Sequence, residues 1–271
     1  MKLMNVLAVV VLTAGALLGG ACSGPTEPKP GPFEYPLEVG NQWEYVQTQV
    51  YDFRDERPDS IEQWEFAVEV VRVDTIVDDI LQYHMHGVWM KDTIGGGIYE
   101  GTNGYLNTAD GLYLRMSDAS LLVLPKTAPT RSVAPRGFGA MPHVPLAGNP
   151  DQSASFPIVY EPALLVLPYP QSVGARWVFN EFDEPEGAFE RMIDGREKIA
   201  TEAGSFDCFR IRFIFPPELA DISVTDYVAE EGLVRRVIEI PGFITTDYLA
   251  PTGRDTVAYS ETYNLVGYTL K

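Results

Sequence analysis

The sequence predicts an all-β fold, mainly antiparallel, that is built from two related β units. Apolar and polar residues alternate with a period of two along many segments, which is typical of strands with one buried face. An eleven-residue pattern at 35–45 recurs at 169–179, and no segment has the periodicity of a long amphipathic helix. We therefore expect one strongly curved sheet or a pair of sandwiches, with little helix.

The first 21 residues have the order of an export signal. Lys2 supplies a positive charge, an apolar run follows from Val6 to Leu18, and three small residues then precede Cys22. The apolar run is shorter than the roughly 20 residues that a membrane span needs. We predict a signal peptide over residues 1–21 and expect no transmembrane segment after it.

Small residues directly before a cysteine make this leader resemble a lipobox, which is the site cut by the lipoprotein signal peptidase. The resemblance implies lipidation of Cys22, a membrane as partner through that N-terminal lipid, and a place in the cell envelope, on an outer membrane or cell surface. Gly19 stands where the lipobox prefers Leu, and Gly19 with Ala21 also fits the small-x-small rule of the ordinary signal peptidase. Secretion without an anchor is therefore the alternative.

Residues 22–32, CSGPTEPKPGP, are rich in Gly and Pro and have no apolar periodicity. Such a composition is typical of an extended, semi-stiff tether. The chain has two cysteines, so lipidation of Cys22 would leave Cys208 without a disulfide partner. Without the lipid, a bridge between the two cysteines would become the alternative.

Two repeated patterns predict the division into β units. Residues 35–45 (YPLEVGNQWEY) and 169–179 (YPQSVGARWVF) share Tyr, Pro, Val, Gly and Trp at identical spacing. A weaker likeness joins DGLYLR, which begins at Asp110, to EGLVRR, which begins at Glu231. We predict a first β unit over 33–124 and a second over 168–271.

The strand that follows each copy of the eleven-residue pattern places two aromatic side chains on one face. These pairs are Trp43 with Tyr45 and Trp177 with Phe179. We interpret both pairs as core residues, and a platform that stacks a ligand is the alternative.

Further strands and turns are predicted from local patterns. Residues alternate clearly at 64–70, 83–89, 209–215 and 257–265. Turn pairs that predict hairpins are Asn103-Gly104, Asp110-Gly111, Glu231-Gly232 and Pro241-Gly242. The only short helical candidate is 216–222.

The segment between the units is rich in proline. Nine prolines fall within 125–168, a density that disfavours helices and central strands. We predict a linker or loop over 125–167. A passive linker is the plain interpretation, and a lid formed by Phe138, Met141 and His143 is the alternative.

The charge balance argues against a nucleic-acid partner. Asp and Glu number 38 against 20 Lys and Arg, so the formal net charge is −18. A body this acidic repels a phosphate backbone, and no basic stripe offsets the repulsion.

The chain resembles bacterial lipoproteins to which no chemistry is assigned. The resemblance rests on the leader, the tether, the Y-P-x-x-V-G-x-x-W-x-Y pattern, and the stretches AGSFDCFRIRF at 203–213 and DYVAEEGLVRR at 226–236. The resemblance implies a β-rich envelope protein and carries over no active-site residue. A more distant likeness is to half-barrel lipoprotein carriers, whose curved sheets hold acyl chains.

No residues predict a catalytic site, and we expect no cofactor. His84 and His86 face the same way on a strand and are the candidates for metal binding, but the sequence fixes no further ligand beside them, so we expect no metal site. Strand alternation also places Cys208 with Arg210 and Arg212, whose charges would lower the pKa of the thiol. Because no base accompanies it, we interpret Cys208 as a structural thiol.

These observations favour a non-enzymatic envelope protein that binds an apolar ligand or an envelope partner. A structural or interaction module with a solid core is the alternative. A hydrolase whose site the sequence does not reveal is a further alternative.

Overall fold

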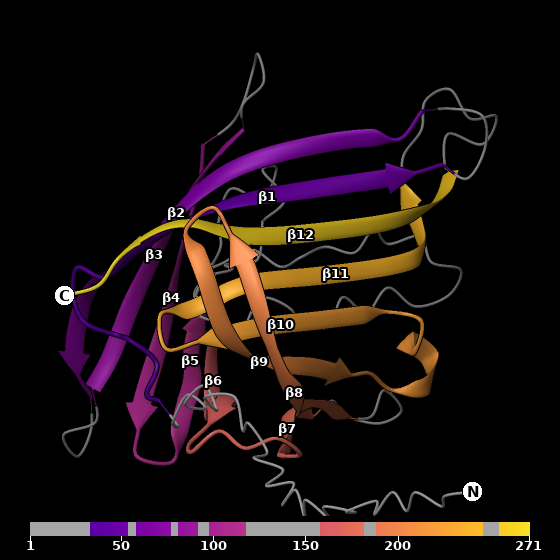
Figure 1. Ribbon diagram of the computed structural model, residues 1–271. Coiled ribbons are helices and arrows are strands. Elements are labelled where there is room, and N and C mark those ends of the chain that lie inside the picture. Colours follow the sequence, from indigo (N-terminus) through magenta and orange to yellow (C-terminus); the bar gives the residue numbers. More distant parts are fainter. Residues whose placement is uncertain are drawn as a thin grey trace, which may run out of the picture. The chain divides into compact units, whose positions relative to one another are not determined.

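Twelve antiparallel strands form one sheet in the computed structural model of the protein (Figure 1). The structure describes residues 33–53, 58–76, 81–91, 98–117, 158–181, 188–245 and 255–271, which all belong to one unit spanning 32–271. The strands are β1 (Gln42–Asp52), β2 (Ser60–Thr75), β3 (Leu81–Lys91), β4 (Ile98–Thr108), β5 (Gly111–Ser117), β6 (Ile158–Pro168), β7 (Arg176–Glu181), β8 (Ala188–Thr201), β9 (Gly204–Ile214), β10 (Ser223–Ala229), β11 (Gly232–Thr245) and β12 (Asp255–Thr269). A single 3-10 turn, Pro217–Leu219, stands where the short helical segment was predicted.

The fold class predicted from the sequence is confirmed, and of the two expected arrangements the strongly curved sheet is the one found. The strand order is β6-β5-β4-β3-β2-β1-β12-β11-β10-β9-β8-β7. The first six strands therefore fill one half of the sheet and the last six fill the other. Among the residues that the structure describes, none belongs to a helix with the length and apolarity that a membrane crossing requires.

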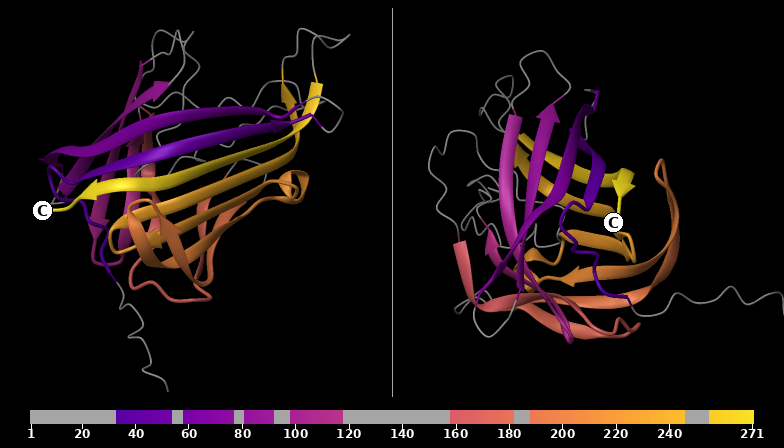
Figure 2. Two further views of the ribbon diagram at one scale, coloured as in Figure 1. Left: turned by 45° about the horizontal axis from the view of Figure 1, so that its top comes forward. Right: turned by 90° about the vertical axis from the view of Figure 1, so that its left-hand side faces the viewer.

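The two halves meet in two different ways. β1 pairs with β12 along its whole length, from Gln42 opposite Thr269 to Asp52 opposite Ala258. β6 and β7 lie at opposite ends of the strand order and are not paired with each other, yet the sheet curls until they come close (Figure 2). We call the β6–β7 junction the seam.

Two side chains bridge the seam. The indole Nε1 of Trp177 donates to the backbone oxygen of Leu165 at 3.1 Å. The guanidinium Nη1 of Arg191 donates to the backbone oxygen of Val166, also at 3.1 Å. The sheet is therefore nearly closed, by a strand ladder at one junction and by side-chain bridges at the other.

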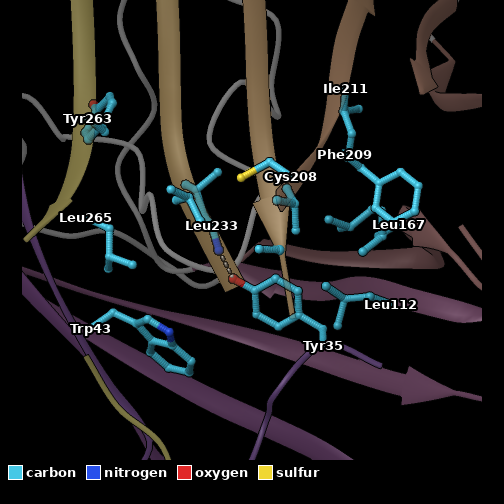
Figure 3. Close-up of a cluster of buried hydrophobic side chains, with 14 of the residues drawn as sticks. Tyr35, Trp43, Leu112, Leu167, Cys208, Phe209, Ile211, Leu233, Tyr263 and Leu265 are labelled. Atoms are coloured by element: carbon cyan, nitrogen blue, oxygen red, sulfur yellow. Dashed lines mark hydrogen bonds between the residues drawn. The ribbon is translucent and has the colours of Figure 1, made fainter. Parts of the chain in front are cut away.

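Buried side chains from both halves form one shared core. Figure 3 shows Tyr35, Trp43 and Leu112 from the first half beside Cys208 and Leu233 from the second, and the Tyr35 hydroxyl accepts a hydrogen bond from the Leu233 amide at 3.0 Å. Because apolar side chains of one half contact those of the other, neither half of the sheet buries its apolar face without the other.

The two copies of the eleven-residue pattern have the same local structure. Gly40 and Gly174 both adopt a positive φ, 91° and 94°, in the turns that lead into β1 and β7. Trp43 and Trp177 follow, and each indole nitrogen donates to a backbone oxygen, of Glu231 and Leu165 respectively. All four predicted core aromatics, Trp43, Tyr45, Trp177 and Phe179, are buried.

The copies also contact each other. The amide of Tyr35 donates to the hydroxyl of Tyr169 at 2.8 Å. The side chain of Gln171 accepts from the amide of Phe33 at 3.0 Å and donates to its carbonyl at 2.8 Å. The segments that lead into β1 and β7 are therefore joined, although 134 residues separate the two tyrosines.

The predicted linker over 125–167 is wrong at its C-terminal end, because residues 158–167 belong to β6, which pairs with β5. A proline is tolerated on an edge strand or in a bulge, and β6 offers both. The register shifts between Leu114 and Met116, whose partners are Leu164 and Val159, so Pro162 lies where the ladder is interrupted. Residues 118–157 lie outside the described residues.

Two of the four predicted hairpin turns are confirmed, at Asp110-Gly111 and at Glu231-Gly232. Asn103-Gly104 instead lies inside β4, where a Cβ on Gly104 would come within 2.8 Å of Gln82 Nε2, so this glycine permits close packing. Pro241-Gly242 lies inside β11, where the register with β12 shifts between Ile240 and Phe243. It is a bulge, which is a permitted place for proline in a sheet.

Candidate functional site

Four charged side chains are buried in the second half of the sheet. Arg191 on β8, Asp226 on β10, Arg236 on β11 and Glu261 on β12 are each at most 1% exposed. Charged groups are rarely buried unless they are paired and hydrogen-bonded. We call these four residues the buried charged cluster and take it as the candidate site.

Asp226 and Arg236 form a bidentate pair directly across the β10–β11 register. Arg236 Nε donates to Asp226 Oδ1 at 2.5 Å, and Arg236 Nη2 donates to Asp226 Oδ2 at 2.8 Å. Burial alone would lower the pKa of Arg236, but the Asp226 carboxylate beside it raises that pKa above its ordinary value. Each carboxylate oxygen of Asp226 therefore accepts a hydrogen bond from Arg236.

Glu261 is satisfied by three neutral donors. Its Oε1 accepts from the amide of Gln47 and from the hydroxyl of Tyr263, and its Oε2 accepts from the hydroxyl of Tyr259 at 2.7 Å. Burial and the Glu261 charge together raise the pKa of Tyr263 well above its ordinary value, so this phenol remains a donor. The carboxylate of Glu261 is thus held without a direct cation partner.

Arg191 is the incompletely satisfied member of the cluster. Its guanidinium packs against two aromatic rings, 4.0 Å from the centroid of Phe179 and 4.2 Å from that of Phe213. Nη1 donates across the seam to Val166, whereas Nε and Nη2 are buried and have no hydrogen-bond partner among the residues that the structure describes. Burial lowers the pKa of Arg191 to about 9, with Arg236 adding to this effect and Asp226 opposing it.

This geometry suits binding better than covalent chemistry. Asp226 is occupied by Arg236, and Glu261 accepts three hydrogen bonds, so both carboxylates of the cluster are already engaged. The hydrogen-bond donors of the cluster that could hold a ligand are the N–H groups on Arg191 Nε and Nη2. Such a planar pair recognises carboxylate or phosphate oxygens.

The structure gives the two histidine candidates separate partners. His84 is 3% exposed, and its Nε2 lies 2.9 Å from Asp74 Oδ2. His86 Nδ1 lies 3.3 Å from Thr102 Oγ1. Burial, helped by Arg72, lowers the pKa of His84 although Asp74 opposes the shift. Within the described ranges there is no group of three or more His, Cys, Asp or Glu side chains placed to hold a metal ion.

Cys208 is a buried thiol, as the sequence predicted for a structural cysteine. The expectation that arginines lower its pKa is wrong. Arg210 and Arg212 both donate to Asp194, at 2.7 and 2.5 Å, and burial, with smaller contributions from nearby carboxylates, raises the pKa of Cys208 to about 12. Cys22, the predicted lipidation residue, lies outside the described residues.

The buried charged cluster is not among the sites that were predicted from the sequence. The alternation of the strands could have indicated it. Each charged residue has buried apolar or aromatic neighbours two positions away on either side, so its side chain points to the same buried face of the sheet. These triplets are Phe189-Arg191-Ile193, Val224-Asp226-Val228, Val234-Arg236-Ile238 and Tyr259-Glu261-Tyr263.

Comparison with known proteins returned two solved structures. No protein-family model matches the chain, and no curated protein sequence matches it. One structure is that of a presumed exported protein with a YmcC-like fold from Bacteroides fragilis, at 13% identity and a TM-score of 0.37 over 88% of this chain and 99% of that one. The other is a presumed lipoprotein from Parabacteroides distasonis, at 14% identity and a TM-score of 0.35 over 89% of this chain and 100% of that one.

Proposed function

We propose that this chain is a lipid-anchored protein of the cell envelope that binds an apolar ligand inside its curved sheet and catalyses no reaction. The observation that carries the proposal is the number of strands. A closed sheet of about eight strands is just wide enough for side chains to fill, whereas this nearly closed sheet has twelve. The strands beyond eight would give such a sheet space for a ligand beside its own side chains.

The seam supports the proposal because it offers a route to the interior. The side chain of Trp177 bridges β7 to β6 and that of Arg191 bridges β8 to β6, and no ladder joins β6 to β7 in the described strand order. Parting them would break few hydrogen bonds, whereas parting β1 from β12 would break a ladder of eleven residue pairs. A ligand that enters at the seam leaves the remaining strand pairs intact.

The envelope location and the anchor rest on the leader, the tether and Cys22. The test is to label expressing cells with a palmitate analogue and to compare the wild type with Cys22→Ala. We expect label on the wild-type protein and none on the variant. Label that persists in the variant, or never appears on the wild type, would remove the anchor and leave a secreted protein.

Ligand binding is tested on the protein as cells make it. The wild-type protein, purified from cells, is extracted with organic solvent, and the extract is analysed by mass spectrometry against an extract of an unrelated lipoprotein prepared in the same way. We expect an apolar species that is enriched in the first extract at a near-stoichiometric amount. Equal extracts would argue against an internal ligand.

A structural or interaction module is the second candidate, and the density of the shared core favours it. Tyr45 stacks on Phe66 with ring centroids 4.9 Å apart, and Phe66 meets Tyr263 edge-on at 5.6 Å. If such packing continues throughout the interior, the protein's role lies in contacts with an envelope partner. The same extraction separates the candidates, because a solid core carries no ligand.

A further inference from the structure

We infer that Arg191 is the receptor for a carboxylate, and that the ligand is an acyl chain that ends in one. This inference rests on the proposed function, and it names the chemical class of the ligand and the residue that recognises its polar end.

The two buried arginines present the same pair of donors in different states. In Arg236 the Nε and Nη2 groups hold the two oxygens of Asp226. In Arg191 the same two nitrogens are buried without a partner. The N–H groups of Nε and Nη2 lie side by side in the guanidinium plane and match the two oxygens of a carboxylate. The protein thus contains one filled and one unfilled copy of the same recognition element.

The orientation of Arg191 is fixed without the missing partner. The rings of Phe179 and Phe213 both pack against the guanidinium, with centroids 4.0 and 4.2 Å from its carbon, and Nη1 donates to the carbonyl of Val166. The N–H groups of Nε and Nη2 are therefore the donors with which Arg191 would hold a ligand. A donor pair held in place before binding loses little conformational freedom when an anion arrives.

The chain does not supply the anion from within the cluster. Asp226 is taken by Arg236, and Glu261 is taken by Gln47, Tyr259 and Tyr263. Buried arginine donors in native proteins are almost always hydrogen-bonded, so the pair that is unfilled among the described residues calls for a partner from outside the cluster. The lowered pKa of Arg191 fits a guanidinium that has no anion in direct contact.

The residues around Arg191 indicate the chemistry of the part of the ligand that lies behind the carboxylate. Across the β8 register Arg191 lies opposite Trp177 and Phe213, and the ring of Phe179 packs against its guanidinium. An aromatic environment favours an apolar chain behind the carboxylate. The other buried arginine in the described cluster is already paired, so a single bidentate donor pair faces the ligand, which suits a monoanionic carboxylate better than a dianionic phosphate.

The test is a competition for photolabelling. Wild-type protein is purified from cell membranes in nonionic detergent and labelled with a palmitic acid analogue that carries a diazirine in its chain. Unlabelled palmitic acid, hexadecanol and hexadecyl phosphate then compete with the probe. We expect palmitic acid to compete at a concentration at least tenfold lower than hexadecanol, where tenfold corresponds to about 1.4 kcal/mol, and hexadecyl phosphate to compete less well than the acid.

The variants assign that preference to Arg191. Arg191→Met should bring palmitic acid and hexadecanol to equal competition, and Arg191→Lys, which keeps the charge but loses the planar donor pair, should reduce the preference. Arg212→Met is the matched control, since it removes a positive charge from a solvent-exposed arginine on β9, and it should keep the full preference.

Each contrary outcome has its own meaning. Equal competition by acid and alcohol on the wild type would overturn the inference and leave the proposed function standing. Tighter competition by the phosphate would overturn the carboxylate assignment, and a full preference in Arg191→Met would overturn the role of Arg191. No specific labelling, together with equal organic extracts, would overturn the proposed function and the inference with it. The ligand comparison on the wild type does not require any variant to fold.

Discussion

Arg236 holds Asp226 through two parallel hydrogen bonds, and neither side chain is exposed to solvent. The pair lies directly across β10 and β11, so two central strands of the second half are joined by buried charges as well as by their ladder. Such a pair is sensitive to the loss of one partner, because the remaining charge stays buried and unpaired.

Removing Asp226 alone should destabilise the protein strongly. We expect Asp226→Leu to lower the free energy of unfolding by about 3–5 kcal/mol, as is usual when one member of a buried ion pair is lost. The double variant Asp226→Leu/Arg236→Met should recover most of that loss, because it removes both members of the pair and leaves neither charge buried without its partner. Urea unfolding followed by tryptophan fluorescence measures both, and equal losses in the single and double variants would contradict the interpretation.

The protein should lose stability in alkaline solution. The folded pKa of Cys208 is raised to about 12, and burial also raises the pKa of Tyr51 to about 12. Between the ordinary thiol value near 9 and about 12, these two groups therefore bind more protons in the folded state than in the unfolded state, and the stability that they contribute falls as the pH rises through this range. Urea unfolding at several pH values from about 8 to 11 checks the direction.

The same burial makes a separate prediction for the thiol of Cys208. At about pH 8 it should react with a thiol reagent such as DTNB only after unfolding in urea, since the reagent needs an accessible thiolate. The Cys208→Ala variant supplies the baseline. Fast modification of the native protein that depends on Cys208 would contradict the buried, protonated state.

His84 predicts a loss of stability in mildly acidic solution. Its folded pKa is lowered below the ordinary value of 6.5, so below about pH 6.5 the unfolded state takes up the proton more readily. The free energy of unfolding should therefore fall as the pH drops through this range. His84→Gln should show a shallower fall than the wild type, and His86→Gln on the same strand is the matched control. An unchanged slope in His84→Gln would contradict the assignment.

The two junctions between the halves should differ in hydrogen exchange. β1 is paired on both sides, with β2 and β12, whereas β7 is paired with β8 alone. We expect backbone amides of β7 and β6 to exchange faster than those of β1 and β12, because a ladder protects amides and side-chain bridges do not. Native-state exchange followed by mass spectrometry measures this. Equal protection at both junctions would show that the seam is paired in solution.

The sequence predicts the strands better than their partners. The alternation of Phe209, Ile211 and Phe213 and the turn at Asp110-Gly111 are local signals, and both appear in the structure. The pairing of β1 with β12 joins residues more than two hundred positions apart, and a period of two does not encode which strand lies beside which. β6 was missed because its prolines mask an apolar run at the edge of the sheet.

The candidate site could not be predicted by assigning every polar position to the solvent face. Arg191 and Asp226 occupy positions that strand alternation marks as buried. At these positions the alternation predicts burial correctly, whereas the polarity of the residue predicts exposure to solvent. The partners of Asp226 and Glu261 come from neighbouring strands, so their satisfaction becomes visible only with the strand order. The unfilled donors of Arg191 require atomic positions.

The ladder between β1 and β12 sets the order in which the sheet can be completed. β1 is synthesised before the other eleven strands and β12 after them, so one edge of β1 waits through most of translation without its neighbour. An unpaired strand edge is a template for unwanted pairing with other chains, and contacts between distant segments form slowly. The nascent chain therefore has its greatest need of a chaperone in the interval between the emergence of these two strands.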